Sequence, residues 1–187
     1  MLEIEAKFKI TDEKAILRAL KRIGARFKGR VEEKDIYYKA PTCCKKASAV
    51  RLRSAGKRNI FTVKRIPKKT FSRNFKIRDE FETDIENKKA FQEILKILKF
   101  NPAFRKEKRR LLYEWRRLKI SVDKLPFIGV YLEIEGDRKR IRKAAKALGL
   151  DKKNAITSTY MELFDRYKKL NKKPGLELVF RRKKSRG

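Results

Sequence analysis

Two glutamates and a lysine alternate with apolar residues at the start of the chain. Glu3, Glu5 and Lys7 occupy every second position in the first half of segment 2–10, and the positions between them are apolar. Because successive side chains of a β-strand point to opposite faces, this pattern predicts one charged face and one apolar face. Two carboxylates on one rigid face can share a hard divalent cation, and the neighbouring lysine can hold an anion that also contacts the cation. A surface strand with solvated charges would show the same pattern.

The same alternation recurs along the chain. It predicts seven further strands, at 31–39, 49–54, 59–66, 75–86, 104–115, 119–123 and 130–135. Four helices with one apolar face each are expected, one capped by Thr11, one at 87–99, one capped by Asp137 and one capped by Ser158. The apolar strand faces give these helices a surface to cover. The pattern therefore predicts an α+β protein, either an open sheet with one wet face or an eight-stranded antiparallel β-barrel with a polar, charged interior.

In a closed barrel the charged faces would line a central tunnel. The acids on these faces are Glu3, Glu5, Glu80, Glu82, Asp123, Glu133 and Glu135, and the bases are Lys7, Lys9, Arg51, Arg53, Lys64, Arg78, Lys106, Lys108 and Arg110. In segment 104–115 both faces are charged, so alternation alone does not choose between the 106/108/110 face and the 105/107/109 face. Carboxylates suit Mg²⁺ or Mn²⁺, and arginine and lysine suit phosphate. The ligand that fits such a lining best is a triphosphate.

The composition excludes several kinds of site. The chain has 187 residues, a formal net charge of +32 and no histidine, so it has no histidine-based triad, general base or zinc ligand. The charge excess favours polyanions as partners. The adjacent Cys43 and Cys44 give no disulfide framework and no metal-ligand spacing. Because no apolar run of about 18 residues and no signal sequence is present, we expect no membrane span and a cytoplasmic location. Heavy use of charged residues beside a single glutamine, Gln92, suggests a thermophilic host.

Several short motifs occur in an order that resembles one known family. Beside Glu3-Ile4-Glu5-Ala6-Lys7, they are Asp35-x-Tyr37, Val50-Arg51-Leu52-Arg53, Thr62-Val63-Lys64, Glu80-x-Glu82, Lys108-x-Arg110, Ser121-Val122-Asp123, the block 129–135 and the block 158–163. Over about residues 1–167 the chain resembles the CYTH superfamily, also called triphosphate tunnel metalloenzymes. The blocks 129–135 and 158–163 look most like the class IV adenylyl cyclase branch.

The resemblance implies a set of roles inside an eight-stranded tunnel, and it selects the 106/108/110 face of the sixth strand as the inner one. Metal ions, Mg²⁺ or Mn²⁺, would be held by Glu3, Glu5, Glu133 and Glu135. Phosphates would be bound by Lys7, Arg51, Arg53, Lys64, Lys108 and Arg110. Lys7 and Asp123 are the candidates for catalysis. Additional candidates are Glu80, Glu82, Asp35 and Tyr160. Glu80, Glu82 and Asp123 would orient the bases or join a second metal site. As an alternative, each base named here could serve only to pair with a carboxylate of the tunnel, without binding phosphate.

The leading hypothesis is a tunnel domain at 1–170, followed by a basic tail at 171–187, that converts ATP to cyclic AMP and pyrophosphate. One alternative is a triphosphatase acting on tripolyphosphate, thiamine triphosphate or nucleoside triphosphates. Another is a barrel that binds RNA or polyphosphate without turnover, which the net charge favours but the clustered glutamates argue against. The sequence is compatible with a homodimer. Nucleic acid could bind to the basic surface, but this reading is not favoured.

Overall fold

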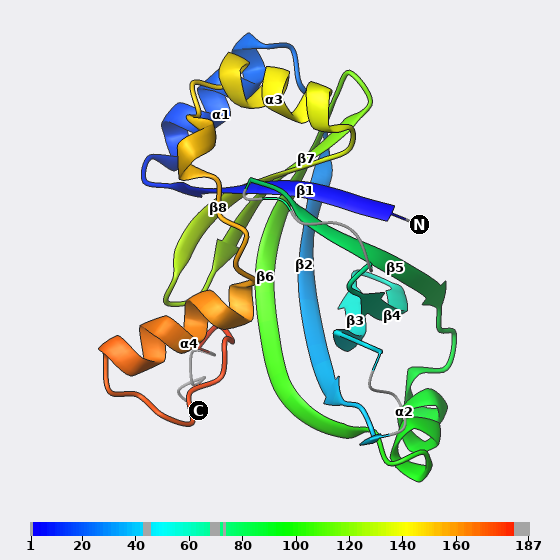
Figure 1. The fold of residues 1–187 in the computed structure, drawn as a ribbon. Coiled ribbons are helices and arrows are strands. Elements are labelled where there is room, and N and C mark those ends of the chain that lie inside the picture. The colour runs from blue at the N-terminus through cyan, green and yellow to red at the C-terminus, as the bar shows by residue number, and fades with distance from the viewer. Residues whose placement is uncertain (1, 43–45, 68–71, 73, 182–187) are drawn as a thin grey trace, which may run out of the picture.

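A closed antiparallel barrel forms the body of the protein. The computed structural model describes residues 2–42, 46–67, 72 and 74–181, so Cys43 and Cys44 lie outside the described residues. The strands are β1 (Leu2–Ile10), β2 (Arg26–Lys39), β3 (Ala49–Ala55), β4 (Arg58–Arg65), β5 (Lys76–Asp84), β6 (Asn101–Trp115), β7 (Leu118–Leu125) and β8 (Gly129–Glu135). They close in the order β1-β5-β4-β3-β2-β6-β7-β8 (Figure 1). The prediction of an eight-stranded barrel is confirmed, and the open-sheet alternative is wrong.

Four α-helices accompany the barrel, as predicted. They are α1 (Glu13–Arg22), α2 (Lys88–Ile97), α3 (Arg138–Ala147) and α4 (Tyr160–Leu170), with a short 3₁₀ turn at Lys152–Asn154. Two caps differ from the prediction by one residue. Asp12, rather than Thr11, accepts the hydrogen bond from Ala15 N at the start of α1. At the start of α4, Thr159 rather than Ser158 forms a capping box with Glu162.

Two strands extend beyond their predicted ends. β2 begins at Arg26, five residues before the predicted start, and β6 begins at Asn101 rather than at residue 104. Pro102 therefore lies in the first residues of a strand, a position where its missing N–H is tolerated. Both ends belong to the longest pairing in the barrel, which runs from Arg26↔Glu114 to Lys39↔Asn101.

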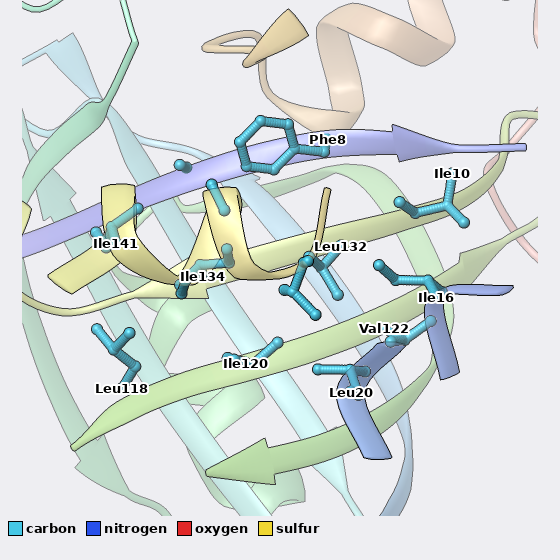
Figure 2. Packing of buried hydrophobic residues seen from close by; sticks show 14 of the residues in the cluster. Phe8, Ile10, Ile16, Leu20, Leu118, Ile120, Val122, Leu132, Ile134 and Ile141 are labelled. Atoms are coloured by element: carbon cyan, nitrogen blue, oxygen red, sulfur yellow. The ribbon is translucent and has the colours of Figure 1, made fainter. Parts of the chain in front are cut away.

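The apolar strand faces point outward and are covered by helices. Phe8, Ile120, Leu132 and Ile134 pack beneath α1 and α3, where Leu20 and Ile141 meet them (Figure 2). Similar packing joins α2 to β3 and β4, and α4 to β8. Because the outer faces form the hydrophobic core, the charged faces are directed into the barrel. This is the arrangement that the alternating pattern predicted.

The segment after α4 folds back onto β6. The carbonyl of Leu178 accepts a hydrogen bond from Glu107 N at 2.7 Å, and Phe180 N donates to Glu107 Oε2 at 3.0 Å. The Leu178 side chain is fully buried. Part of the predicted basic tail is therefore packed on the barrel, while a division at residue 170 stays a prediction. No helix in the described part of the chain is both long and apolar enough to cross a bilayer.

The β6–β7 hairpin has an unusual two-residue turn. Trp115 pairs with Leu118, and the two residues between them, Arg116 and Arg117, have φ values of 48° and 61°. Turns of this kind favour Asn-Gly because both central residues need positive φ. A left-handed conformation costs a non-glycine residue roughly 1–2 kcal/mol. This hairpin therefore retains two arginines at positions where they strain the backbone.

Candidate active site

The inward-facing charged residues enclose a cavity of about 620 Å³. Its ten basic side chains are Lys7, Arg51, Arg53, Lys64, Lys76, Arg78, Lys106, Lys108, Arg110 and Lys119, and its eight acidic ones are Glu3, Glu5, Glu80, Glu82, Glu133, Glu135, Glu162 and Asp165. Three further acids, Glu33, Asp35 and Asp123, are buried behind this lining. Burial of so many charges is tolerable because most of them pair with one another.

Asp35 holds two of the bases in place. Its carboxylate accepts two hydrogen bonds from Arg53, at 2.8 and 3.0 Å, and lies 3.0 Å from Lys106 Nζ. Burial alone would raise the pKa of Asp35, but Lys106 and Arg53 outweigh it and hold the pKa well below its usual range. Lys106 also donates to the Tyr37 hydroxyl at 3.0 Å. Asp35 therefore stays ionised and fixes Arg53 and Lys106 from behind.

Asp123 has the same function for the neighbouring bases. It is completely buried, accepts a hydrogen bond from Arg110 Nε at 2.6 Å and another from Lys108 Nζ at 3.1 Å. The Tyr160 hydroxyl donates to it at 3.1 Å. Burial and the adjacent Asp123 raise the pKa of Tyr160, so the hydroxyl remains a donor. Because Asp123 does not line the cavity, its position is that of a residue that orients Lys108 and Arg110.

Lys7 lies between two of the glutamates. Its Nζ is 3.6 Å from Glu5 and 3.4 Å from Glu133, and it donates to the Ser158 carbonyl at 3.1 Å. Arg110 also pairs with Glu133. Burial opposes ionisation of Glu133, but Lys7 and Arg110 prevail and its pKa is well below the usual range. A second lysine, Lys76, donates to Glu5 at 2.9 Å. The pair of strands β1 and β8 therefore presents carboxylates and ammonium groups side by side.

On the other side of β1, the strands β5, β4 and β3 supply a third group. Lys64 Nζ is 2.7 Å from Glu3 and 3.0 Å from Glu80. Arg51 donates through Nη2 to Thr62 at 2.9 Å and to Glu82 at 3.1 Å. Its Nε is buried, and no acceptor for it is found among the described residues. A buried donor without a partner costs free energy, so a ligand oxygen that reached Arg51 Nε would gain a hydrogen bond.

The carboxylates predicted to hold a metal ion lie on the neighbouring strands β1 and β8. Glu5 and Glu135 are directly paired across the two strands, and Glu3 is two residues from Glu5 on the same face. Burial raises the pKa of Glu135, and the negative charges of Glu3 and Glu5 add to this effect. Lys119, 3.4 Å from Glu135, acts in the opposite direction. Glu3 and Glu5 are paired with Lys64 and Lys76, at 2.7 and 2.9 Å. Within the described residues, no three acidic or cysteine side chains are grouped so that they could hold a metal ion.

The structure brings the predicted residues together with a few that the sequence analysis omitted. All predicted phosphate-binding and metal-binding residues line the cavity, together with Glu80, Glu82 and Tyr160, whereas Asp35 and Asp123 lie behind the wall. Their chemical roles stay predictions. Lys9, expected inside, is exposed and lies against the ring of Tyr131. The charged residues that were not among the candidates are Lys76, Lys119, Glu162 and Asp165 in the lining and Glu33 behind it. Alternation places Glu33 and Lys76 on the same strand faces as Asp35 and Arg78. Glu162 and Asp165 come from α4, so alternation along strands could not have found them.

The stability of the barrel is expected to fall between pH 4.5 and pH 2 because of Glu33. Burial alone would raise the pKa of this carboxyl, but Lys108, Arg110 and Arg53 lower it from 4.5 to about 2. A depressed pKa stabilises the fold above the unfolded value, and that stabilisation is lost as Glu33 is protonated in the native state. The shift corresponds to about 3 kcal/mol. Urea unfolding at stepwise lower pH measures it.

Glu33→Gln should remove the proton that Glu33 takes up on unfolding in this pH window. The slope of the free energy of unfolding against pH should therefore be smaller than in the unchanged protein, by about 1.4 kcal/mol per pH unit. The matched control is Glu32→Gln, because Glu32 is exposed and pairs with Arg109 on the outside of the barrel. Its pH dependence should equal that of the unchanged protein. Equal slopes for all three proteins would contradict the role given to Glu33.

Comparison with known proteins points to one family. The model of the CYTH domain matches residues 1–160. The protein named "Putative adenylate cyclase MJ0240", from Methanocaldococcus jannaschii, is 29% identical over 175 residues, which cover 87% of this chain and 98% of that protein. The PH1012 protein of Pyrococcus horikoshii has a similar structure, with a TM-score of 0.74 and 27% identity over 86% of this chain and 98% of that one.

A more distant structure shares the fold alone. It is a Hippeastrum protein, HpAC1, described as a "putative adenylyl cyclase" that "reveals a dominant triphophatase activity". The TM-score is 0.61 and the identity 15%, over 88% of this chain and 95% of that one.

Proposed function

The chain belongs to the CYTH domain family, and from this premise we propose that its tunnel is the active site of a divalent-metal-dependent enzyme that acts on a triphosphate. One observation carries the proposal. Bases from β1, β3, β4 and β6 converge on one cavity that is also lined by the glutamates of β1 and β8. A site that only bound polyanions would gain nothing from those carboxylates. A site that binds a metal–triphosphate complex needs both.

Each group of residues has a distinct task in this proposal. Glu3, Glu5, Glu133 and Glu135 would hold Mg²⁺ or Mn²⁺, which neutralises phosphate charge and acts as a Lewis acid when bound. The phosphates would replace carboxylates as partners of the lining bases, which are Lys7, Arg51, Arg53, Lys64, Lys108 and Arg110. Asp35 and Asp123 keep four bases oriented before the ligand arrives. Such preorganisation is what lowers the barrier of a charge-dominated reaction.

ATP cyclisation is the first reaction that we propose for this site. The 3′-hydroxyl oxygen forms a bond to the α-phosphorus, the bond to the bridging oxygen breaks, pyrophosphate leaves and the hydroxyl proton passes to solvent. The support is the name of the Methanocaldococcus relative, which is similar over almost its whole length. Lys7 is assigned to the reacting phosphate because its ammonium lies between Glu5 and Glu133. Asp123 is assigned a positioning role.

Hydrolysis of a triphosphate is the second candidate, and one feature of the cavity favours it. Eighteen of the 25 residues that line the cavity are charged, and its large apolar or aromatic side chains are Tyr37, Ile66, Tyr160 and Met161. A nucleobase usually binds against apolar or aromatic walls. A lining of this kind suits an inorganic chain of phosphates at least as well as ATP.

The products decide between these reactions. Purified protein is incubated with Mg²⁺ or Mn²⁺ and, in parallel, with ATP, GTP, thiamine triphosphate or tripolyphosphate, and the products are separated by chromatography. Cyclic AMP with pyrophosphate is expected from ATP. Phosphate release, above all from tripolyphosphate, would instead establish the triphosphatase. If no substrate is converted with either metal at any temperature below unfolding, the proposed function is wrong.

A further inference from the structure

The tunnel does not account for the positive charge of this protein. Its ten lining bases are offset by eight lining acids and by the buried Glu33, Asp35 and Asp123. The whole chain nevertheless has a net charge of +32. The excess therefore lies on the outer surface, where it generates a field that attracts polyanions. A surface site for a polyanion would be separate from the tunnel.

One hollow on that surface gathers bases around an aromatic ring. It has a volume of about 340 Å³ and is lined by Trp115, Arg116 and Arg117 of the β6–β7 hairpin and by Arg140 and Lys143 of α3. We call it the hairpin notch. Its four cationic side chains are exposed, and none forms an ion pair with a carboxylate of the described residues. By contrast, Glu114, next to the notch, pairs with Arg26 and Lys28.

The backbone of the notch is strained in a way that the fold does not require. Arg116 and Arg117 occupy left-handed conformations, with φ values of 48° and 61°. Asparagine and glycine would satisfy the same turn without that strain. Residues in such conformations cluster at functional sites, and here two consecutive ones project guanidinium groups from one hairpin.

The walls of the notch are held firmly. The indole N–H of Trp115 donates to the Ile23 carbonyl at 2.7 Å, and the Arg116 guanidinium lies 4.7 Å from the indole ring. At the junction between β8 and α3, a Cβ on Gly136 would lie 2.7 Å from the side chain of Leu118. Only glycine therefore permits this close approach of the hairpin to the start of α3.

The helix side of the notch carries two neighbouring positive charges. Arg140 and Lys143 are three residues apart and so share one face of α3. The first turn of α3 contains no acidic residue, and the carboxylate at this end of the helix is that of the N-cap residue Asp137, which accepts hydrogen bonds from Lys139 N and Arg140 N. An anion in the notch would relieve the repulsion on both sides.

We propose that the hairpin notch binds the backbone of a single-stranded nucleic acid. The four cations would contact successive phosphates, and the stacked Arg116–Trp115 pair would offer a flat cationic surface to a base. Basic grooves combined with aromatic side chains bind single strands in this way, with little preference for sequence. The site lies near α3, at the end of the barrel away from α4 (Figure 1). It is separate from the tunnel and does not depend on the reaction proposed there.

The test replaces the two arginines of the turn by asparagine and glycine, the residues that this type of turn favours. Arg116→Asn combined with Arg117→Gly removes two charges while relaxing the backbone, so the variant is expected to fold. Binding of a fluorescent oligouridylate of about 20 nucleotides is measured by anisotropy at several salt concentrations. We expect Kd to rise about tenfold, and the slope of log K against log salt to become shallower by about 1.4, for two lost phosphate contacts. Triphosphate turnover should not change.

The matched control is Lys172→Gly combined with Lys173→Asn. Lys172 also has a positive φ, of 50°, and both lysines are exposed beyond the end of α4. This variant should change Kd less than about twofold. Equal weakening by the two variants would show diffuse attraction and overturn the proposal, as would no weakening by either. Binding to phosphatidylserine vesicles without binding to the oligouridylate would assign the notch to a membrane surface and would likewise overturn it.

Discussion

Asp123→Asn is expected to lower the free energy of unfolding by about 3–5 kcal/mol, because it leaves buried cations without their counter-charge. Asp123 is completely buried and pairs with both Lys108 and Arg110. Asparagine keeps the size of the side chain but offers one neutral acceptor oxygen in place of a carboxylate. Urea unfolding near neutral pH measures the loss.

The control for this change is Asp84→Asn. Asp84 also binds an arginine through two hydrogen bonds, from Arg58 at 3.1 and 3.0 Å, but both side chains are largely exposed. Exposed pairs contribute about 0–1 kcal/mol, so this variant should remain almost as stable as the unchanged protein. If Asp123→Asn proved equally mild, Asp123 would not be the anchor of the buried bases, and a direct role in the reaction would become the better explanation of its position.

Alternation along the strands was sufficient to predict most of the tunnel. When each strand has one apolar and one charged face and the helices cover the apolar faces, the charged faces must line the interior of the barrel. Alternation failed for β6, where both faces are charged. The structure gives the reason. The outer face of β6 is not covered by a helix at Arg109, which is exposed and pairs with Glu32 on β2. Without a core to face, the outer residues need not be apolar.

Which acid pairs with which base could not be predicted in the same way. Asp35 holds Arg53 and Lys106, which lie on the two strands beside β2, and these contacts depend on the register of the closed barrel. The register of non-consecutive strands is a tertiary property, and no local spacing encodes it. Alternation of Leu176, Leu178 and Phe180 is compatible with a short strand, but its place beside β6 also depends on tertiary contacts, and it adds only an isolated bridge to the sheet.

Glu135→Gln is expected to lower metal-dependent turnover on the order of 100-fold while leaving the fold intact. Glu135 lies near Glu3 and Glu5, and it forms an ion pair with the exposed Lys119, 3.4 Å away. Loss of that weak pair should hardly affect stability. Loss of one of four negative oxygen ligands should weaken Mg²⁺ or Mn²⁺ binding. Turnover measured over a range of metal concentrations should therefore show a raised half-saturating concentration as well as a lower maximum.

Glu93→Gln is the matched control, because Glu93 also pairs with one exposed lysine, Lys96 at 3.7 Å, but on the outer helix α2. Its turnover should be unchanged. Thermal unfolding adds a readout that does not need turnover: a ligand that binds only the folded state stabilises it according to its concentration relative to Kd. The stabilisation by Mn²⁺ with tripolyphosphate should therefore shrink for Glu135→Gln and persist for Glu93→Gln. Full stabilisation and full turnover in the Glu135 variant would place the metal elsewhere in the tunnel, whereas loss of turnover with full stabilisation would assign Glu135 to the reaction rather than to binding.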